Sequence, residues 1–373
     1  MSGPYWLDAD PAPSFPPPGA GRVDVAIVGA GLTGCSAALR LAQAGQRVRV
    51  HEAGFVAAGA SGRNGGFVLR GGATRYDLAR EAYGADAARE LWAWTERALE
   101  RFAELGGETV RRVGSLRLAV DEAERDAIRR ELEALREDGF AAQWIEKPPP
   151  PFRGAIFHPG DAAFDPARFT RRLAAAAVAA GAEIAERSRV AAVDELDAER
   201  VLVATDGLGG GLLPELDAAV QPVRNQVLVT EPLAAERFPR PHYARHGHAY
   251  WQQLPDGRLL LGGFRDADPE TEATAEEAGN PVVEAALERF LRETLHVEAP
   301  VERRWTGVFG LTPDLLPLAG ELRENVWVAA GYSGHGNVLG VACGEAVADA
   351  LLGRAAAPLP LLDPRRIALR RLS

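Results

Sequence analysis

Residues 23–52 read VDVAIVGAGLTGCSAALRLAQAGQRVRVHE, and this stretch decides the fold. The apolar run Val23–Val28 predicts a central parallel strand that ends where glycines follow. Gln46 to His51 then alternates as a second strand. Between the strands, a helix that Gly45 closes has one apolar face, made of Cys35, Ala38, Leu39 and Ala42. The stretch is therefore a complete β-α-β unit within about 30 residues.

Three glycines open the helix of this unit, and an acidic residue ends its second strand. Gly29, Gly31 and Gly34 form a G-x-G-x-x-G pattern, in which bare backbone N–H groups and the helix dipole can meet a pyrophosphate. Taken alone, the pattern has an alternative, a glycine-rich turn without a nucleotide. Glu52 favours the nucleotide, because a carboxylate about 20 residues downstream can accept hydrogen bonds from both adenosine ribose hydroxyls. The unit predicts an adenine dinucleotide, either FAD or NAD.

Two further glycine-rich segments favour FAD over NAD. Residues 59–66 read GASGRNGG, and residues 331–337 read GYSGHGN between a buried strand and a helix. Glycine lets backbone approach a flat ligand closely, although a flexible surface loop is the alternative for the first segment. The helix after the second segment offers about half a positive charge, which suits the flavin edge where negative charge gathers on reduction. His335 adds to that field, contacts substrate, or only caps the turn.

The rest of the chain alternates between two domains. Residues 250–254 and 258–262 flank the turn Pro255-Asp256-Gly257 and predict an antiparallel hairpin. The fold class is therefore α/β combined with α+β. Helices are also expected over residues 86–105, after a capping box of Asp121 and Glu124, and from Asp165-Pro166 to Ala180. We expect a proline-rich arm over 1–22, a dinucleotide-binding domain over 23–80, 155–210 and 303–373, and a substrate domain over 81–154 and 211–302.

Composition excludes several classes of function. The chain has 373 residues and a formal net charge of −10, and its arginine clusters are scattered among carboxylates, so nucleic acid is not an expected partner. Two cysteines exclude a disulfide framework. No run of about 18 apolar residues and no basic-then-apolar leader is visible, so we expect a cytoplasmic enzyme without a membrane span. No metal site is expected.

These residues resemble the FAD-dependent D-amino-acid-oxidase-like superfamily (DAO), which includes sarcosine, glycine and γ-glutamylputrescine oxidoreductases. The resemblance covers nearly the whole chain. It rests on residues 25–52, 60–66, 164–169 and 257–263, on Trp305-Thr306-Gly307 with Thr312-Pro313-Asp314, and on residues 331–336. It implies a Rossmann-like FAD-binding domain of the glutathione-reductase type, interleaved with a substrate domain on a mixed or antiparallel sheet.

The resemblance also implies roles for particular residues. Glu52 binds ribose, Val190 lies on the adenine side, and the substrate lies above the flavin under the sheet that holds Tyr250. The full set implied for FAD is Gly29, Gly31, Leu32, Thr33, Gly34, Glu52, Ala53, Ser61, Gly62, Arg63, Asn64, Gly65, Gly66, Val190, Thr205, Gly307, Gly334, His335, Gly336, Asn337 and Val338.

Departures from the family pattern carry information as well. Gly307 stands where some relatives have a cysteine that binds flavin covalently, so we expect noncovalent FAD. Phe67 and Val338 stand where sarcosine-oxidase-like members have an Arg and a Lys that clamp a carboxylate. The apolar run Arg258–Gly262 lacks the family's oxygen-activating lysine, which leaves oxygen or another molecule as the electron acceptor. Asp206 interrupts the usual A-T-G-A-W pattern.

The resulting hypothesis is an FAD-dependent oxidoreductase that takes a hydride from the C–H next to the nitrogen of a small primary or secondary amine. Tyr250, Trp251 and Phe67 are expected to form an aromatic wall, and His335 and Tyr250 to supply the polar, catalytic contacts. Oxidation of a hydroxy acid or polyol is one alternative. A dinucleotide-binding protein without turnover is the other.

Overall fold

The computed structural model describes residues 3–9, 13–354 and 359–367. Parts of the expected arm (1–2 and 10–12) and of the expected last segment (355–358 and 368–373) therefore lie outside the described residues. The described arm is not wholly extended, because Tyr5–Ala9 forms a short helix, α1. Its Trp6 is buried among apolar side chains of the folded body, including Val227 and Trp305. This apolar anchor holds the short helix against the folded body.

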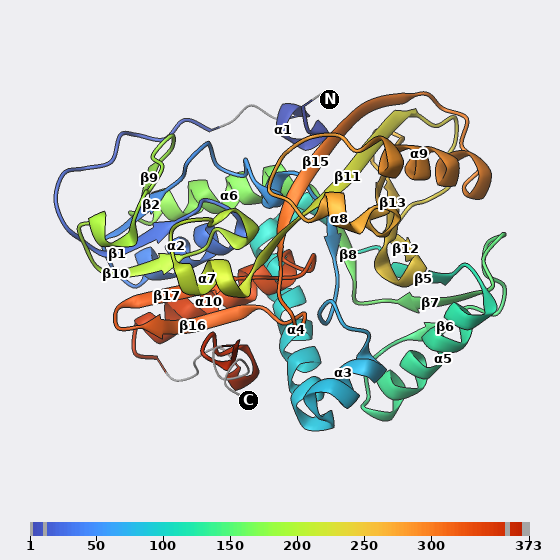
Figure 1. Ribbon diagram of the computed structural model, residues 1–373, viewed down its shortest axis with the longest axis horizontal. Helices are drawn as coiled ribbons and strands as arrows, with labels where there is room; N and C mark the ends of the chain where they lie inside the picture. The colour runs from blue at the N-terminus through green and yellow to red at the C-terminus, as the bar shows by residue number, and fades with distance from the viewer. Residues whose placement is uncertain (1–2, 10–12, 355–358, 368–373) are drawn as a thin grey trace.

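The first sheet is the predicted dinucleotide-binding sheet. Its order is β16-β17-β10-β1-β2-β9, with all neighbours parallel except β16 and β17. The strands are β1 (Val23–Val28), β2 (Val48–His51), β9 (Glu183–Ala185), β10 (Ala198–Val203), β16 (Leu318–Arg323) and β17 (Val326–Ala330). The helices packed with it are α2 (Leu32–Gln43), α6 (Pro166–Ala179) and α10 (Val338–Leu351). Figure 1 shows this layered unit on the left of the molecule.

Small residues let α2 and α10 approach closely behind β1. A Cβ on Gly344 would lie 2.4 Å from Ser36 Oγ, and one on Gly340 would lie 3.0 Å from Thr33 Oγ1. At the same crossing Thr33 Oγ1 and Tyr332 Oη are hydrogen-bonded at 2.9 Å. The contact places the N-termini of both helices side by side. The G-x-G-x-x-G turn before α2 therefore meets the glycine-rich segment 331–337 before α10.

The second sheet has eight strands in the order β15-β11-β14-β13-β12-β5-β7-β6, antiparallel except between β12 and β5. The strands are β5 (Ser115–Ala119), β6 (Gln143–Trp144), β7 (Gly154–His158), β11 (Gln221–Pro232), β12 (His242–Ala244), β13 (Ala249–Gln253), β14 (Arg258–Gly263) and β15 (Val301–Leu311). A small third sheet, in the order β3-β8-β4, joins β3 (Phe67–Val68), β8 (Ala162–Phe164) and β4 (Val110–Arg111). The other helices are α3 (Tyr76–Tyr83), α4 (Ala85–Gly106), α5 (Glu122–Glu137), α7 (Pro214–Ala219), α8 (Pro269–Glu272) and α9 (Pro281–Arg289). Figure 1 shows the large sheet on the right.

Local signals place several of these elements correctly. Asp121 and Asp165 accept N-cap hydrogen bonds from the backbone N–H of Glu124 (2.8 Å) and Arg168 (3.0 Å). The hairpin β13–β14 forms around Gly257, whose φ of +89° suits a glycine. Among the described residues no helix is both long and apolar enough to span a membrane.

Strand pairing and helix packing cross the expected domain boundaries. β7 and β15, expected in the dinucleotide-binding domain, pair with β5 and β11 in the large sheet. α4, expected in the substrate domain, buries its apolar face in the same core as β1 and α2. The reason is that strand pairing and helix packing join segments far apart in sequence, which local patterns cannot report.

Candidate active site

A cavity of about 1150 Å³ runs from the turn after β1 to the face of β13 in the large sheet. It is larger than the ~300–1,000 Å³ typical of pockets for one small ligand. Most residues predicted for the cofactor line it: Gly29, Gly31, Leu32, Thr33, Glu52, Ala53, Ser61, Arg63, Asn64, Gly65, Val190, Thr205, Gly307, Gly334, His335, Gly336, Asn337 and Val338. The cavity therefore has room for a dinucleotide with a small molecule beside it.

At one end of the cavity, the backbone around Gly31 and the carboxylate of Glu52 both line the wall. A Cβ on Gly31 would lie 2.8 Å from Ser61 Oγ and displace it, although this oxygen accepts a hydrogen bond from the Leu32 N–H at 2.9 Å. Glu52 accepts hydrogen bonds from the N–H groups of Ala30 (2.9 Å) and Gly54 (2.8 Å). These bonds fix its carboxylate, whose remaining lone pairs can accept from ribose hydroxyls.

Three predicted cofactor glycines do not line the cavity and have packing roles instead. A Cβ on Gly34 would lie 1.9 Å from Gly29 O, so this glycine lets α2 pack on β1. A Cβ on Gly62 would lie 2.2 Å from Ala57 O, and one on Gly66 would lie 2.5 Å from Phe164 O. Sequence spacing alone cannot separate a glycine that faces ligand from one that faces protein.

The loop 60–66 is held by three side-chain donors from three distant elements. The carbonyl oxygens of Arg63, Asn64 and Gly65 accept from Trp305 Nε1 (2.9 Å), Trp6 Nε1 (2.8 Å) and Gln252 Nε2 (2.6 Å), respectively. The consecutive carbonyls are thereby tied to the protein rather than turned into the cavity. Sequence reasoning missed Trp6 and Gln252, because their partners lie 58 and 187 residues away.

The glycine-rich segment 331–337 contacts the segment 59–66 through Asn337. Its amide Nδ2 donates to Asn64 Oδ1 (3.2 Å) and to Phe67 O (2.8 Å). The same turn is held from behind by Asp206, whose carboxylate accepts from the N–H groups of Gly310 (2.9 Å) and Gly331 (2.8 Å). Burial raises the pKa of Asp206, while these amides act to lower it. Asp206, which departs from the family pattern, thus has a positioning role.

Tyr250 and Phe67 form the wall of the cavity at the sheet end. Their rings meet edge to face at 5.7 Å, and both line the cavity. Tyr250 Oη accepts from Asn225 Nδ2 at 3.4 Å, and burial raises the pKa of Tyr250, so its phenol stays protonated. Asn225 Oδ1 is buried and has no hydrogen-bond partner in the described part of the chain.

The placement of Trp251 in this wall is wrong. Trp251 is fully buried on the opposite face of β13, stacked on His242 (5.5 Å) and Phe152 (5.7 Å). Successive residues of a strand point to opposite faces, so Tyr250 and Trp251 cannot share one wall. Gln252 points the same way as Tyr250 and reaches the loop instead.

His335 lies at the cavity beside two arginines. Its Nδ1 is buried without a hydrogen-bond partner among the described residues. Burial, together with the positive charges of Arg117 and Arg265, lowers the pKa of His335 to about 4. The imidazole is therefore neutral near pH 7.

Arg265 is a cavity residue that sequence reasoning missed. It follows β14 directly, and its guanidinium lies over the Phe309 ring at 5.7 Å. It donates to His248 Nδ1 at 3.1 Å and forms no ion pair with any carboxylate of the described residues. Burial lowers the pKa of Arg265. Burial and the charge of Arg265 also lower the pKa of His248, so the His248 imidazole is favoured in its neutral form, which can accept this hydrogen bond. The charge of the neighbouring Asp266 offsets part of the cost of burying this cation, and a ligand anion in direct contact would relieve more of it.

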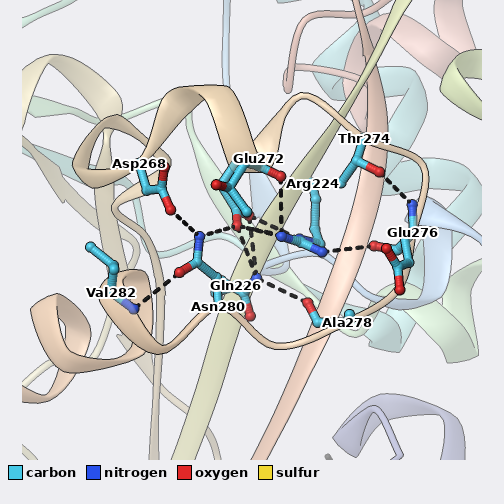
Figure 2. A network of polar contacts seen from close by, with 10 residues as sticks. Arg224, Gln226, Asp268, Glu272, Thr274, Glu276, Ala278, Asn280 and Val282 are labelled. Carbon is cyan, nitrogen blue, oxygen red and sulfur yellow. Dashed lines mark hydrogen bonds and ion pairs between the residues drawn. The ribbon is translucent and has the colours of Figure 1, made fainter.

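A buried polar network fixes the segment 264–280 that carries Arg265 to the cavity. Figure 2 shows Arg224 and Gln226 of β11 converging on Glu272 at the end of α8. Glu272 accepts from Arg224 Nη2 (2.8 Å), Gln226 Nε2 (3.2 Å) and Asn280 Nδ2 (2.9 Å). At the far side of this segment Glu277 forms an ion pair with Arg63 of the loop 60–66 at 2.7 Å.

Fold and cavity together define a dinucleotide-dependent oxidoreductase, in which a Rossmann-like sheet faces a mixed β-sheet across the ligand site. The chain belongs to the FAD dependent oxidoreductase family (DAO), whose model matches residues 24–350. Its cofactor is FAD, and the bare turns, Glu52 and the two converging helix N-termini fit that group. The resemblance, fold class and cofactor inferred from the sequence are confirmed.

Individual relatives agree with this assignment. The chain is 29% identical to "Gamma-glutamylputrescine oxidoreductase" of Escherichia coli (strain K12) over 367 residues, which cover 89% of this chain and 84% of the relative. The crystal structure of glycine oxidase from Geobacillus kaustophilus matches with a TM-score of 0.77 and 25% identity, over 93% of this chain and 99% of that one. That of L-proline dehydrogenase from P. horikoshii has a TM-score of 0.76 at 21% identity, over 94% and 99%.

Proposed function

We propose that the protein oxidises a small primary or secondary amine that also carries an acidic group. When bound, FAD would supply the acceptor for a hydride from the C–H next to the substrate nitrogen, and the imine product would hydrolyse in water. The observation that carries the proposal is the sheet end of the cavity. There a neutral histidine, an aromatic wall and an arginine without a carboxylate partner face the same space. The printed names of the relatives, which include an oxidoreductase of an amine and an oxidase of an amino acid, support the amine part.

The residues divide the work by their chemistry. Phe67 and Tyr250 flank the substrate, and Arg265 pairs with its acidic group in place of the clamp expected at positions 67 and 338. His335, which is neutral near pH 7, lines the same space and can form a hydrogen bond with the substrate nitrogen. The positive charge of Arg265 near the cavity favours the build-up of negative charge there, whereas Arg117 is paired with Glu131.

We also propose that FAD is held noncovalently. Gly307 lies in the cavity wall, where a thiol would be needed for attachment. Both cysteines, Cys35 and Cys343, are buried inside α2 and α10 and do not line the cavity. Release of FAD into the supernatant on acid denaturation tests this, and retention with the protein overturns it.

The experiment for the function is anaerobic mixing of FAD-loaded protein with a panel of compounds. The panel pairs acidic amines, neutral amines of the same size, and hydroxy acids, and flavin bleaching is the readout. We expect acidic amines to bleach the flavin and to yield a carbonyl product. Bleaching by hydroxy acids alone would identify an alcohol dehydrogenase, and a flavin that no compound bleaches would favour a binding protein without turnover.

A further inference from the structure

The short helix α1 is anchored to the large sheet. Tyr5 Oη donates to Asp256 Oδ2 at 2.5 Å, in the turn between β13 and β14. Asp8 forms an ion pair with Arg303 of β15. Neither Tyr5 nor Asp8 lines the cavity. These two contacts therefore fix the position of α1 without touching the walls of the ligand site.

Other residues of α1 meet the loop 60–66, part of which lines the cavity. Trp6 Nε1 donates to the carbonyl oxygen of Asn64 at 2.8 Å. Leu7 lies against the bare backbone of Gly62, where an added Cβ would be 2.8 Å from Leu7 Cδ2. A Cβ added to Gly66 would lie 3.4 Å from Trp6 Cζ2. Because Gly62 and Gly66 do not line the cavity, α1 supports the loop from the side that faces away from the ligand.

The helix α1 can leave this position without unfolding of either large sheet. A helix of five residues has no stability of its own in water, so α1 forms only while it is docked. Residues 13–22, farther along the arm, are mostly exposed and belong to no sheet. Trp305 and Gln252, which hold the carbonyl oxygens next to Asn64 O, lie on strands of the large sheet and stay in place. Of these three restraints, only the one on Asn64 O is lost when α1 detaches.

We propose that α1 positions the loop 60–66 for FAD and that FAD is released after α1 detaches. Asn64 lines the cavity, and a carbonyl oxygen left without a donor inside a protein is costly, so the loop changes its geometry when Trp6 leaves. Coupling between two binding events is reciprocal, so bound FAD in turn holds α1 in place. The inference concerns the cofactor alone and does not depend on which substrate the protein oxidises.

A variant that loosens α1 but keeps its contacts with the loop 60–66 tests the release step. Tyr5→Phe combined with Asp8→Asn removes both anchors at the large sheet. We expect this double variant to release FAD about 10-fold faster, because it loses a hydrogen bond to a charged group and the detached state becomes more populated. The measurement is the rise of free-flavin fluorescence after dilution. Glu100→Gln removes another exposed ion pair, between α4 and Arg112, and this control should release FAD at the wild-type rate.

Limited proteolysis of the wild type tests the reciprocal step. Chymotrypsin can cleave after Tyr5, Trp6 or Leu7 only while α1 is detached, and mass spectrometry identifies the shortened chain. We expect bound FAD to slow this cleavage by a comparable factor, although α1 does not line the cavity. Equal cleavage with and without FAD, or wild-type FAD release from the double variant, overturns the proposal. Neither measurement uses a substrate, so its failure is separate from a failure of the proposed amine oxidation.

Discussion

Replacing Arg265 by glutamine tests which substrates the cavity selects. Glutamine keeps a donor for His248 Nδ1, which Arg265 contacts at 3.1 Å, but removes the positive charge. A hydrogen bond to a charged group contributes about 1.5–3 kcal/mol, and 1.36 kcal/mol is a factor of ten. We therefore expect kcat/KM for an acidic amine to fall about 10- to 150-fold. For a neutral amine of the same size, it should change less than threefold.

The control for this variant lies on β14, the strand that precedes Arg265. Arg258 stands at the other end of β14 and pairs with Asp256 (2.8 Å) and Glu302 (2.7 Å) away from the cavity. Arg258→Gln should leave the preference for acidic over neutral amines unchanged, and Arg265→Lys should restore part of it. An equal loss for both amines in Arg265→Gln would refute the ion-pair argument, because it would indicate damage to the cavity rather than a lost charge.

Three further predictions concern cofactor retention and stability. Glu52→Gln should weaken FAD binding about 10-fold or more by fluorescence titration, because a charged acceptor for the ribose is lost. Trp6→Phe removes the donor to Asn64 O and should lower the free energy of unfolding by about 1 kcal/mol and speed FAD release, whereas Trp94→Phe on α4 should not alter FAD release. Burial lowers the pKa of His242 from 6.5 to about 4, so the unfolded chain takes up the proton first. Stability should fall by up to about 3 kcal/mol between pH 6.5 and pH 4 in denaturant titrations, and less in His242→Gln.

The dinucleotide half of the site could be predicted because its signals are local. Glycines at fixed offsets after a strand, followed by an acid after the next strand, lie within one β-α-β unit, and Glu52 faces the cavity as expected. The capping residues Asp121 and Asp165 are local signals of the same kind. In each case the interacting groups lie within about one supersecondary unit, so the sequence order reflects the geometry.

The substrate half could be predicted only in part. An alternating strand shows that Tyr250 and Trp251 face opposite ways, but not which of them faces the ligand. That choice depends on where α9 packs, since the core around Phe290 covers the Trp251 face. Arg265 was missed for a related reason. Arg265 stands out because it forms no ion pair with a carboxylate of the described residues, and a sequence does not show which charged side chains pair.

The loop 60–66 connects the two sheets around the cavity through hydrogen bonds. Trp305 and Gln252 hold it from the large sheet, Asn337 holds it from the start of α10, and Trp6 holds it from the arm. Trp305, Trp6 and Gln252 each restrain a different backbone carbonyl of the loop, and Asn337 restrains the Asn64 side chain, so no single bond fixes the loop. These bonds depend on how the two sheets are placed. Because buried hydrogen bonds are costly to leave unmade, a shift of one sheet against the other would break several at once. The geometry that brings FAD and substrate together is thus a property of the whole fold rather than of the glycine-rich turns alone.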